Sequence, residues 1–354
     1  MDRTKLNEMF EKSGAEVLIS EAPQTRLWYA DVQTTDGFIA IEKDRATLFV
    51  DSRYIEYAQK HAKNVDIVLI KGNSMSEWFA QRNFKKIALE KNYLTKSVQD
   101  RIVKMVNPET IEWVDAQYLR IVKSKAELEK MQAVIDISLK SYNQFMQQVR
   151  EGMTEKEAAA LLNYLLKMNG ADKEGFDEII AIGPSSAEPH HHPTERKLVK
   201  GELLKVDFGA LYKGYTADIT RTSIFGGEEM AKDPKMVEIL EIVKESARRG
   251  REAVRPGIKA SEIDKVCRNY IVSKGYGDLF LHSTGHGLGI DVHEWPSVSA
   301  FSDFVLEPGM IITVEPGIYI EGLGGARIED DVLVTQDGHY VFSRPEENNG
   351  QKPF

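Results

Sequence analysis

Short apolar runs alternate with amphipathic stretches over the first third of the chain. Three runs read as strands: VLIS at 17–20, FIAI at 38–41 and ATLFV at 46–50. The stretch RYIEYAQKHAKN at 53–64 spaces its apolar positions as a helix does. This alternation predicts a small α/β domain, which we expect to end near Arg120.

Helix-start signals follow that boundary. Two pairs of residues have the spacing of a capping box: Ser124 with Glu127, and Thr154 with Glu157. The first pair predicts a long helix that runs to about Val149. Asp233 followed by Pro234 predicts the start of another helix.

A repeat is visible in the second part of the chain. Segments 152–171 and 257–276 align without gaps at an offset of 105 residues. Each has an opening glycine, an acid, a helical apolar stripe and a closing glycine, and these acids and closing glycines are Glu157 with Gly170, and Glu262 with Gly275. A strand region bearing a histidine follows each segment, which predicts a duplicated αβ core with a shared site between its halves.

Two aspartates lie in one predicted hairpin, LLKVDFGALYKGYTADITRT. The midpoint between Asp207 and Asp218 falls between Tyr212 and Lys213, so a turn at that point would set the two carboxylates opposite each other. Their Cβ atoms would then be ~5 Å apart, where like charges repel. A bound cation is the simplest candidate for what lies between them.

Further metal-ligand types recur downstream. Glu315 lies in MIITVEPGIYI and Glu329 in GARIEDDVLV, both apolar and strand-like, while His286 is flanked by glycines. Four carboxylates would overwhelm the charge of one divalent ion but nearly balance two ions with a hydroxide. Oxygen ligands with one imidazole suit manganese, cobalt, iron or zinc. Two such ions can activate water and polarise a carbonyl, which is hydrolytic chemistry.

These residues resemble those of the pita-bread metallopeptidases, which include aminopeptidase P, prolidase, methionine aminopeptidase and metal-free creatinase. The resemblance rests on VDFGALYKGYTADITRT, STGHGLGIDVHEWP, ITVEPGIYI and ARIEDDVLV, and on RLWYADVQTTDGFIAI and ATLFVDSRYIEYA near the start. It covers nearly the whole chain. It implies an α+β protein, with a small N-terminal α/β domain at 1–120 and a pita-bread catalytic domain at 121–354.

The resemblance also implies metal ligands. Asp207 and Asp218 would hold one ion and His286 and Glu315 the other, while Asp218 and Glu329 would bridge both. Manganese is the ion we expect first. Glu315 would also move a proton from the attacking water toward the leaving amine.

Other residues are assigned by the same resemblance. His190 and His293 would hydrogen-bond the substrate carbonyl or the developing oxyanion, where one donor can be worth ~3 kcal/mol. Arg327 would hold a metal-bound carboxylate in place. Tyr319 would line the pocket or serve only in packing. His282 lies four residues before His286, but the glycines at 285, 287 and 289 argue against a helical pair of metal ligands, so we expect His282 to form a wall of the pocket.

Simpler interpretations remain open for several of these side chains. His190 begins a tract with His191 and His192, which could be a surface feature, although we expect the latter two to matter less. His293, between apolar neighbours, could be a core residue. Arg327 could pair with Asp331 on the same strand face.

Composition narrows the class of protein. With 354 residues and 42% hydrophobic content the chain can bury two cores. A net charge of −9 argues against nucleic acid or an anionic membrane as partner. The single Cys267 excludes an intrachain disulfide, and no long apolar run predicts a signal peptide or membrane span. We therefore expect a cytoplasmic enzyme, and a homodimer.

The expected substrates are small peptides with proline at the second position. Several microbial prolidases similar to this chain carry Arg directly after HEWP, where this chain has Ser297. Without that cation to bind a free proline carboxylate, Xaa-Pro aminopeptidase is favoured over the alternative, Xaa-Pro dipeptidase. A metal-free hydrolase or a non-catalytic binding protein with this fold would typically have lost ligands.

Overall fold

The computed structural model describes residues 1–348, 350, 351 and 353. Its contacts divide the chain into two compact units, Met1–Arg120 and Ile121–Phe354. The first unit contains, in chain order, α1 (Thr4–Ser13), β1 (Val17–Ser20), α2 (Pro23–Ala30), β2 (Phe38–Glu42), β3 (Ala46–Val50), α3 (Ile55–His61), β4 (Asp66–Leu69), α4 (Ser74–Arg82), β5 (Lys86–Glu90), α5 (Lys96–Val106), β6 (Thr110–Val114) and α6 (Ala116–Leu119).

The first unit is built on one mixed sheet of six strands, in the order β4-β3-β2-β1-β5-β6. The three predicted apolar runs form its centre, and β1, β2 and β3 are buried along their whole length. Phe49 packs edge-on against Trp78 and stacks on Phe79, so aromatic rings of α4 close one part of the core. The predicted α/β character of this region is confirmed.

The second unit is longer. It contains α7 (Lys125–Gln148), α8 (Glu155–Met168), β7 (Lys173–Glu174), β8 (Ile179–Ile182), η1 (Gly183–Ala187), β9 (Leu203–Phe208), β10 (Ala210–Tyr212), β11 (Tyr215–Thr216), β12 (Ile219–Ile224), η2 (Glu228–Met230), α9 (Pro234–Ala253), α10 (Ala260–Ser273), η3 (Gly277–Leu279), β13 (Gly285–Gly287), β14 (Glu294–Val298), β15 (Ile311–Val314), β16 (Gly317–Ile320), β17 (Gly324–Arg327), β18 (Asp330–Val334), β19 (His339–Val341) and η4 (Pro345–Asn348).

The predicted helix starts are confirmed. Both capping boxes are formed, at Ser124 and at Thr154, and the Asp233 side chain accepts a hydrogen bond from the backbone N–H of Lys235 at the start of α9. Each of these bonds satisfies a backbone N–H that has no partner within its helix.

The sequence repeat corresponds to a structural repeat. Helices α8 and α10 begin and end at positions that differ by the same 105 residues as the sequence segments. The closing glycines, Gly170 and Gly275, both have positive φ (107° and 86°), a conformation that ends a helix at little cost only for glycine. Duplication of an αβ unit is therefore present in the fold.

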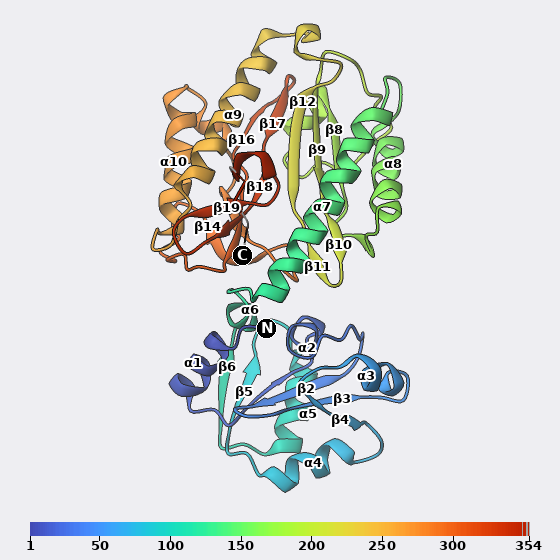
Figure 1. Ribbon diagram of the computed structural model, residues 1–354, viewed down its shortest axis with the longest axis vertical. Helices are drawn as coiled ribbons and strands as arrows, with labels where there is room; N and C mark the ends of the chain where they lie inside the picture. Colours follow the sequence, from blue (N-terminus) through green and yellow to red (C-terminus); the bar gives the residue numbers. More distant parts are fainter. Residues whose placement is uncertain (349, 352, 354) are drawn as a thin grey trace. The chain divides into compact units, whose positions relative to one another are not determined.

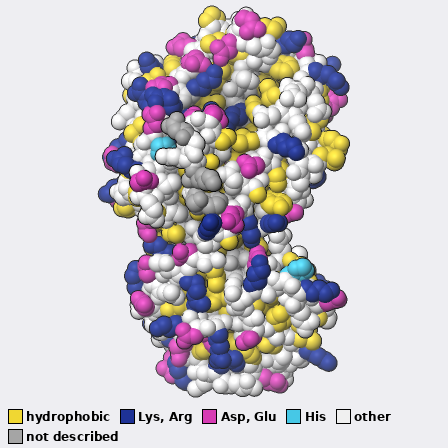
Figure 2. Space-filling view, in the orientation of Figure 1, with side chains coloured by type: hydrophobic (Ala, Val, Ile, Leu, Met, Phe, Trp, Pro, Cys, Tyr) yellow, Lys and Arg dark blue, Asp and Glu magenta, His cyan; other side chains and the backbone are white. Residues whose placement is uncertain are grey.

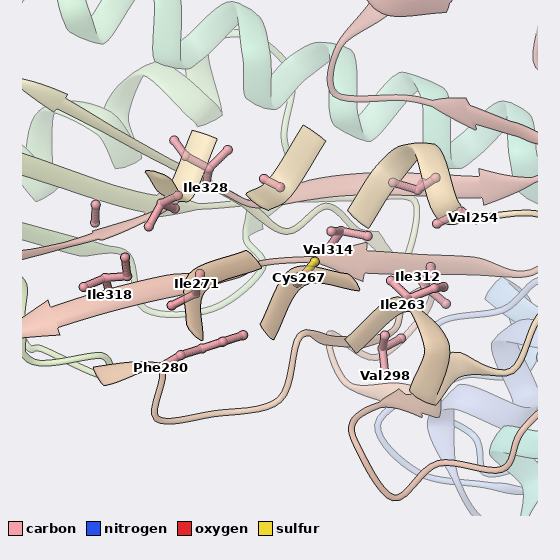
Figure 3. Close-up of a cluster of buried hydrophobic side chains, with 14 of the residues drawn as sticks. Val254, Ile263, Cys267, Ile271, Phe280, Val298, Ile312, Val314, Ile318 and Ile328 are labelled. Carbon is pink, nitrogen blue, oxygen red and sulfur yellow. The ribbon is translucent and has the colours of Figure 1, made fainter. Parts of the chain in front are cut away.

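Antiparallel strands carry the two halves of the second unit. The larger sheets have the orders β12-β9-β8 and β14-β13-β15-β18-β19. Helices α7 and α8 lie beside the first-half strands, and α9 and α10 beside the second-half strands (Figure 1). Figure 3 shows the core beneath α10, where Cys267 is buried among Ile263, Ile271 and Val314, as expected of a packing residue.

The outer surface carries both signs of charge. Lys and Arg side chains are interspersed with Asp and Glu over the face that Figure 2 shows, with no large field of one sign. Among the described residues, the helices are all too short or too polar to span a bilayer.

Candidate metal centre

A cavity of about 460 Å³ opens in the second unit. It is lined by every site residue proposed from the sequence except Tyr319: His190, Asp207, Asp218, His282, His286, His293, Glu315, Arg327 and Glu329. Its size suits a small ligand. Residues that are more than a hundred positions apart in the chain therefore meet at one place.

The hairpin that carries the two aspartates has a different register from the predicted one. Lys213 and Gly214 both have positive φ (49° and 79°) and form the two-residue turn, so Tyr212 pairs with Tyr215. Positive φ at both central residues is typical of the turn that matches strand twist. Asp207 consequently lies opposite Thr220 and not opposite Asp218. Because this register differs from the predicted one by two positions, both aspartates keep the same face.

Three of the acids lie where strands are interrupted. Asp218 separates β11 from β12, Glu315 separates β15 from β16, and Glu329 separates β17 from β18. The prediction that Glu315 and Glu329 lie inside strands was therefore wrong in detail. Two of these breaks are held by backbone bonds: Glu315 N donates to Thr284 O (2.7 Å) and Glu329 N donates to Thr220 O (3.1 Å). At the third, Asp218 N donates to Asp331 Oδ2 (3.3 Å).

The possible ligand atoms converge. One ligand atom from each of Asp218, His286 and Glu329 lies within 4.8 Å of the others. His286 Nε2 is 3.5 Å from Asp218 Oδ2 and 3.6 Å from Glu315 Oε1. His286 Nδ1 lies 3.0 Å from Gly287 O and so carries the proton that it donates there. The Nε2 lone pair is thereby left facing the acids.

The electrostatics of this cluster are unfavourable without a cation. Burial, followed by repulsion from neighbouring carboxylates, raises the pKa values of Asp218 and Glu329 well above their ordinary range. Burial also raises the pKa of Glu315 to about 7 and lowers that of His286 to about 4. Asp207 Oδ1 is buried with no hydrogen-bond partner among the described residues. Divalent cations would neutralise the acids and give Asp207 Oδ1 a partner, so the donor set fits metal binding.

Arg327 connects the cluster to its surroundings. Its guanidinium contacts Asp207 Oδ2 closely, and Arg327 Nε donates to Thr220 Oγ1 (3.0 Å). Thr220 Oγ1 in turn donates to Glu329 Oε2 (2.7 Å). Arg327 therefore pairs with Asp207 and not with Asp331, the alternative partner considered from the sequence. Thr220 was missed in the sequence, although it lies two residues after Asp218 on the same strand face.

The cavity histidines differ in their surroundings. The centroids of the His293 and His286 rings are 4.3 Å apart. His293 is exposed, so it is not a core residue. His282 Nδ1 donates to Ser283 O and its Nε2 accepts from Tyr319 (both 2.8 Å), while burial lowers the pKa of His282 to about 3. The Tyr319 hydroxyl also accepts a bond from Arg327 (3.1 Å), so Tyr319 supports the wall of the cavity.

The histidine tract is not a uniform surface feature. All three histidines border the cavity, but His190 and His192 are exposed whereas His191 between them is buried. His191 hydrogen-bonds Glu155 and Glu188. Glu155 is fully buried. The sequence did not indicate its contact with His191, because an acid in the first turn of a helix is ordinary.

Comparison with known proteins agrees with this geometry. The family model described as metallopeptidase family M24 matches residues 129–336, and that of the creatinase/prolidase N-terminal domain matches residues 3–122. The chain is 40% identical over 313 residues to an Xaa-Pro dipeptidase of Pyrococcus furiosus, covering 88% of each chain.

Solved structures give the same result. An Xaa-Pro dipeptidase from Bacillus anthracis superposes with a TM-score of 0.89 at 36% identity, covering 96% of both chains. An X-Pro aminopeptidase from Thermotoga maritima has a TM-score of 0.88 at 33% identity, covering 96% of this chain and 97% of that one.

Proposed function

The chain belongs to metallopeptidase family M24, and we propose that it is a two-metal Xaa-Pro dipeptidase that hydrolyses dipeptides ending in proline. The proposal rests on two observations taken together. All five proposed metal donors line one cavity, and an Xaa-Pro dipeptidase that is 40% identical matches 88% of the chain. This choice reverses the preference for an aminopeptidase that Ser297 suggested, because the named relatives support the dipeptidase more strongly.

In this proposal the five donors are divided between two divalent ions. Asp207 and Asp218 would hold one, His286 and Glu315 would hold the other, and Asp218 and Glu329 would contact both. The closeness of Asp218, His286 and Glu329 supports this division, since the two bridging acids belong to that group. Manganese is the ion that we propose, on the basis of four oxygen ligands and one imidazole.

When bound, two divalent ions supply an acidic water molecule and a Lewis acid for the scissile carbonyl. Glu315 would accept a proton from the attacking water and pass it to the leaving amine of proline. His190 and His293 donate to the carbonyl oxygen as negative charge develops on it. Arg327 holds Asp207 in its orientation through a charge-assisted bond.

A second candidate, Xaa-Pro aminopeptidase, is favoured by Ser297. This residue lines the cavity and pairs with His286 across β13 and β14. A serine at this position leaves space for the chain of a longer peptide and offers no charge to a free carboxylate.

The test compares four peptides with the manganese-loaded protein. Ala-Pro should be cleaved with a higher kcat/KM than Ala-Pro-Ala, and both should exceed Ala-Ala and Ala-Ala-Ala, because a pocket shaped for the proline ring gains nothing from alanine. A preference for Ala-Pro-Ala over Ala-Pro would establish the aminopeptidase instead. Comparable rates on Ala-Pro-Ala and Ala-Ala-Ala would contradict proline specificity in either form.

A further inference from the structure

The segment that presents His190 to the cavity has no regular secondary structure. This histidine loop, Glu188–Thr194, follows β8 and η1 and contains all three histidines of the tract. A side chain that acts on a substrate must be held to within a fraction of an ångström, which a loop achieves only through contacts with its surroundings. The contacts that hold this loop are therefore part of the site.

Two buried basic side chains hold the loop before His190. Lys205 Nζ, from β9, donates to Glu188 O (2.6 Å) and Pro189 O (3.3 Å). Arg327 Nη1, from β17, donates to the same Pro189 carbonyl (3.2 Å). Because Arg327 also contacts Asp207, the backbone just before His190 is tied to a proposed metal ligand.

One buried carboxylate holds the loop after His190. Glu155 Oε2 accepts bonds from His191 Nε2 (2.8 Å), Thr194 N (2.9 Å) and Thr194 Oγ1 (2.6 Å). Its other oxygen accepts a bond from the backbone N–H of Ile182 (3.0 Å), at the end of β8. Glu155 thus connects the end of β8, at Ile182, to Thr194, the last residue of the histidine loop. Burial opposes the charge on Glu155, but bonds from Thr194, His191 and Ile182 lower its pKa overall.

His191 completes this attachment. Its Nδ1 lies 2.9 Å from Glu188 Oε2 and its Nε2 lies 2.8 Å from Glu155 Oε2. Ionised carboxylates only accept hydrogen bonds, so each ring nitrogen of His191 faces a carboxylate acceptor. His191 borders the cavity, but both of its ring nitrogens are engaged by these carboxylates, so it tightens the loop next to His190 and has no free ring nitrogen to offer a substrate.

The second half of the unit uses the equivalent helix in a similar way. Asp264 of α10 is fully buried and accepts a bond from Thr284 Oγ1 (2.8 Å), two residues before His286. Arg268, which pairs with Asp264, donates to His282 O (2.9 Å). In both halves, a buried acid on the repeated helix therefore fixes a segment that carries a cavity histidine.

We propose that Glu155 and His191 are positioning residues that hold His190 in its catalytic place, an inference that rests on the proposed function through the role of His190. Glu155 is not among the residues that line the cavity, and both ring nitrogens of His191 are engaged by carboxylates. Removing either residue should lower turnover by displacing His190 while leaving the metal ligands in place.

The experiment is a double-mutant cycle between Glu155→Gln and His190→Ala, with kcat on Ala-Pro and bound manganese as readouts. His190→Ala should lower kcat by about 100-fold to 1000-fold, the usual cost of one oxyanion donor. Glu155→Gln should lower kcat at least about tenfold alone and less than about twofold in the His190→Ala background, since it acts through a residue already removed. Bound manganese should be unchanged in all variants.

Glu157→Gln is the matched control. Glu157 lies two residues along the same helix, is exposed, and bonds only within the capping box of α8. It should leave kcat near the wild-type value. Hydrogen exchange supplies a readout independent of activity: amides of the histidine loop should exchange faster in Glu155→Gln and not in Glu157→Gln.

The outcomes separate the two proposals. Equal losses of kcat for Glu155→Gln in both backgrounds, or unchanged exchange of the loop, would overturn the positioning role. Failure of the wild-type protein to hydrolyse any Xaa-Pro peptide would overturn the proposed function, whatever the loop does. Should Glu155→Gln fail to fold, Thr194→Val removes only one of the bonds to Glu155 and must show a smaller loss of kcat with the same dependence on His190.

Discussion

At the scale of single residues, the site combines groups that each have a different reason to be where they are. Asp218 and Glu329 are buried acids whose pKa values are raised by burial and by neighbouring carboxylates. His286 has one nitrogen fixed by Gly287 O and the other facing the acids. Such an arrangement is costly in a folded chain unless a cation completes it.

Removing an acid proposed to bridge both ions, such as Asp218, should affect metal content more than removing His286, which is proposed to hold one ion. Asp218→Ala is expected to lower the occupancy of both metal positions and turnover by more than about 100-fold, whereas His286→Ala should retain about one ion per chain. Elemental analysis of desalted protein measures the number of bound ions per chain, and kcat on Ala-Pro measures turnover. His339→Ala is the control, because the His339 side chain hydrogen-bonds Val254 O and is not a proposed ligand. This variant should keep two ions. Two tightly bound ions in Asp218→Ala would refute the ligand assignment.

His190 and His293 should matter for turnover and not for metal. Replacing either with Ala is expected to lower kcat on Ala-Pro by about 100-fold to 1000-fold, because a donor to the developing oxyanion is lost. Metal content and melting temperature should stay near wild-type values. Loss of metal in step with activity in His190→Ala would make His190 a ligand and the proposed donor set incomplete.

Glu178 provides a pH-dependent test outside the metal ligands. Burial, with smaller contributions from Glu174 and Asp177, raises its pKa from 4.5 to about 7. Its charged form is disfavoured in the folded state, so the folded state loses stability as pH rises from 4.5 through about 7. Glu178→Gln should therefore stabilise the protein at pH 8 by at most about 3 kcal/mol and hardly at all at pH 4.5. Urea unfolding at both pH values measures this, and equal stabilisation at both would contradict it.

At the scale of elements, strand interruptions present the acids and side chains connect the two halves. Thr222 Oγ1 of β12 donates to Arg327 O of β17 (2.8 Å), and Arg221 donates to Glu329 O (2.6 Å). The break at Glu329 is therefore fixed by β12, the strand that directly follows Asp218. A second buried link, between Lys123 and Glu294 (3.0 Å), ties the residues before α7 to the residue after His293.

The β9–β12 hairpin offers a test at this scale. A Cβ on Gly209 would lie 1.7 Å from Ala217 O, next to Asp218, so Gly209→Ala must push the two strands apart. It should cost about 1–3 kcal/mol of stability and reduce manganese binding. Gly338→Ala is the control, because an added Cβ there meets nothing within 4 Å. Full metal content in Gly209→Ala would show that the hairpin spacing does not set the site.

At the scale of the whole molecule, every proposed ligand belongs to the second unit. The first unit has a separate apolar core, which includes Phe49, Trp78 and Phe79. A metal that binds only the folded second unit should stabilise that unit by mass action. The first unit gains nothing directly from the ions.

Hydrogen exchange with and without manganese tests this difference. At manganese concentrations about 100 times its Kd, amides of the second unit that exchange by opening of that unit should slow by up to about 100-fold. Amides of the first-unit sheet should change little. Chelation with EDTA should reverse the effect, and uniform slowing in both units would mean that the two unfold as one body.

The sequence by itself determined much of this protein. Apolar runs and capping residues predicted β1, β2, β3, α7 and α8, because these signals depend only on residues near each other in the chain. The offset of 105 residues predicted the duplication. Residue types and spacing, together with a family resemblance, identified the side chains that line the cavity.

Only the tertiary structure decided how those side chains meet. The hairpin register depends on positive φ at Lys213 and Gly214, which a midpoint count misses. Arg327 contacts Asp207 and not Asp331 because β12 brings Thr220 and Thr222 against β17. Glu155 gained its role from contact with a loop that lies almost forty residues along the chain. Such contacts depend on packing between distant segments, and no local pattern in the sequence encodes them.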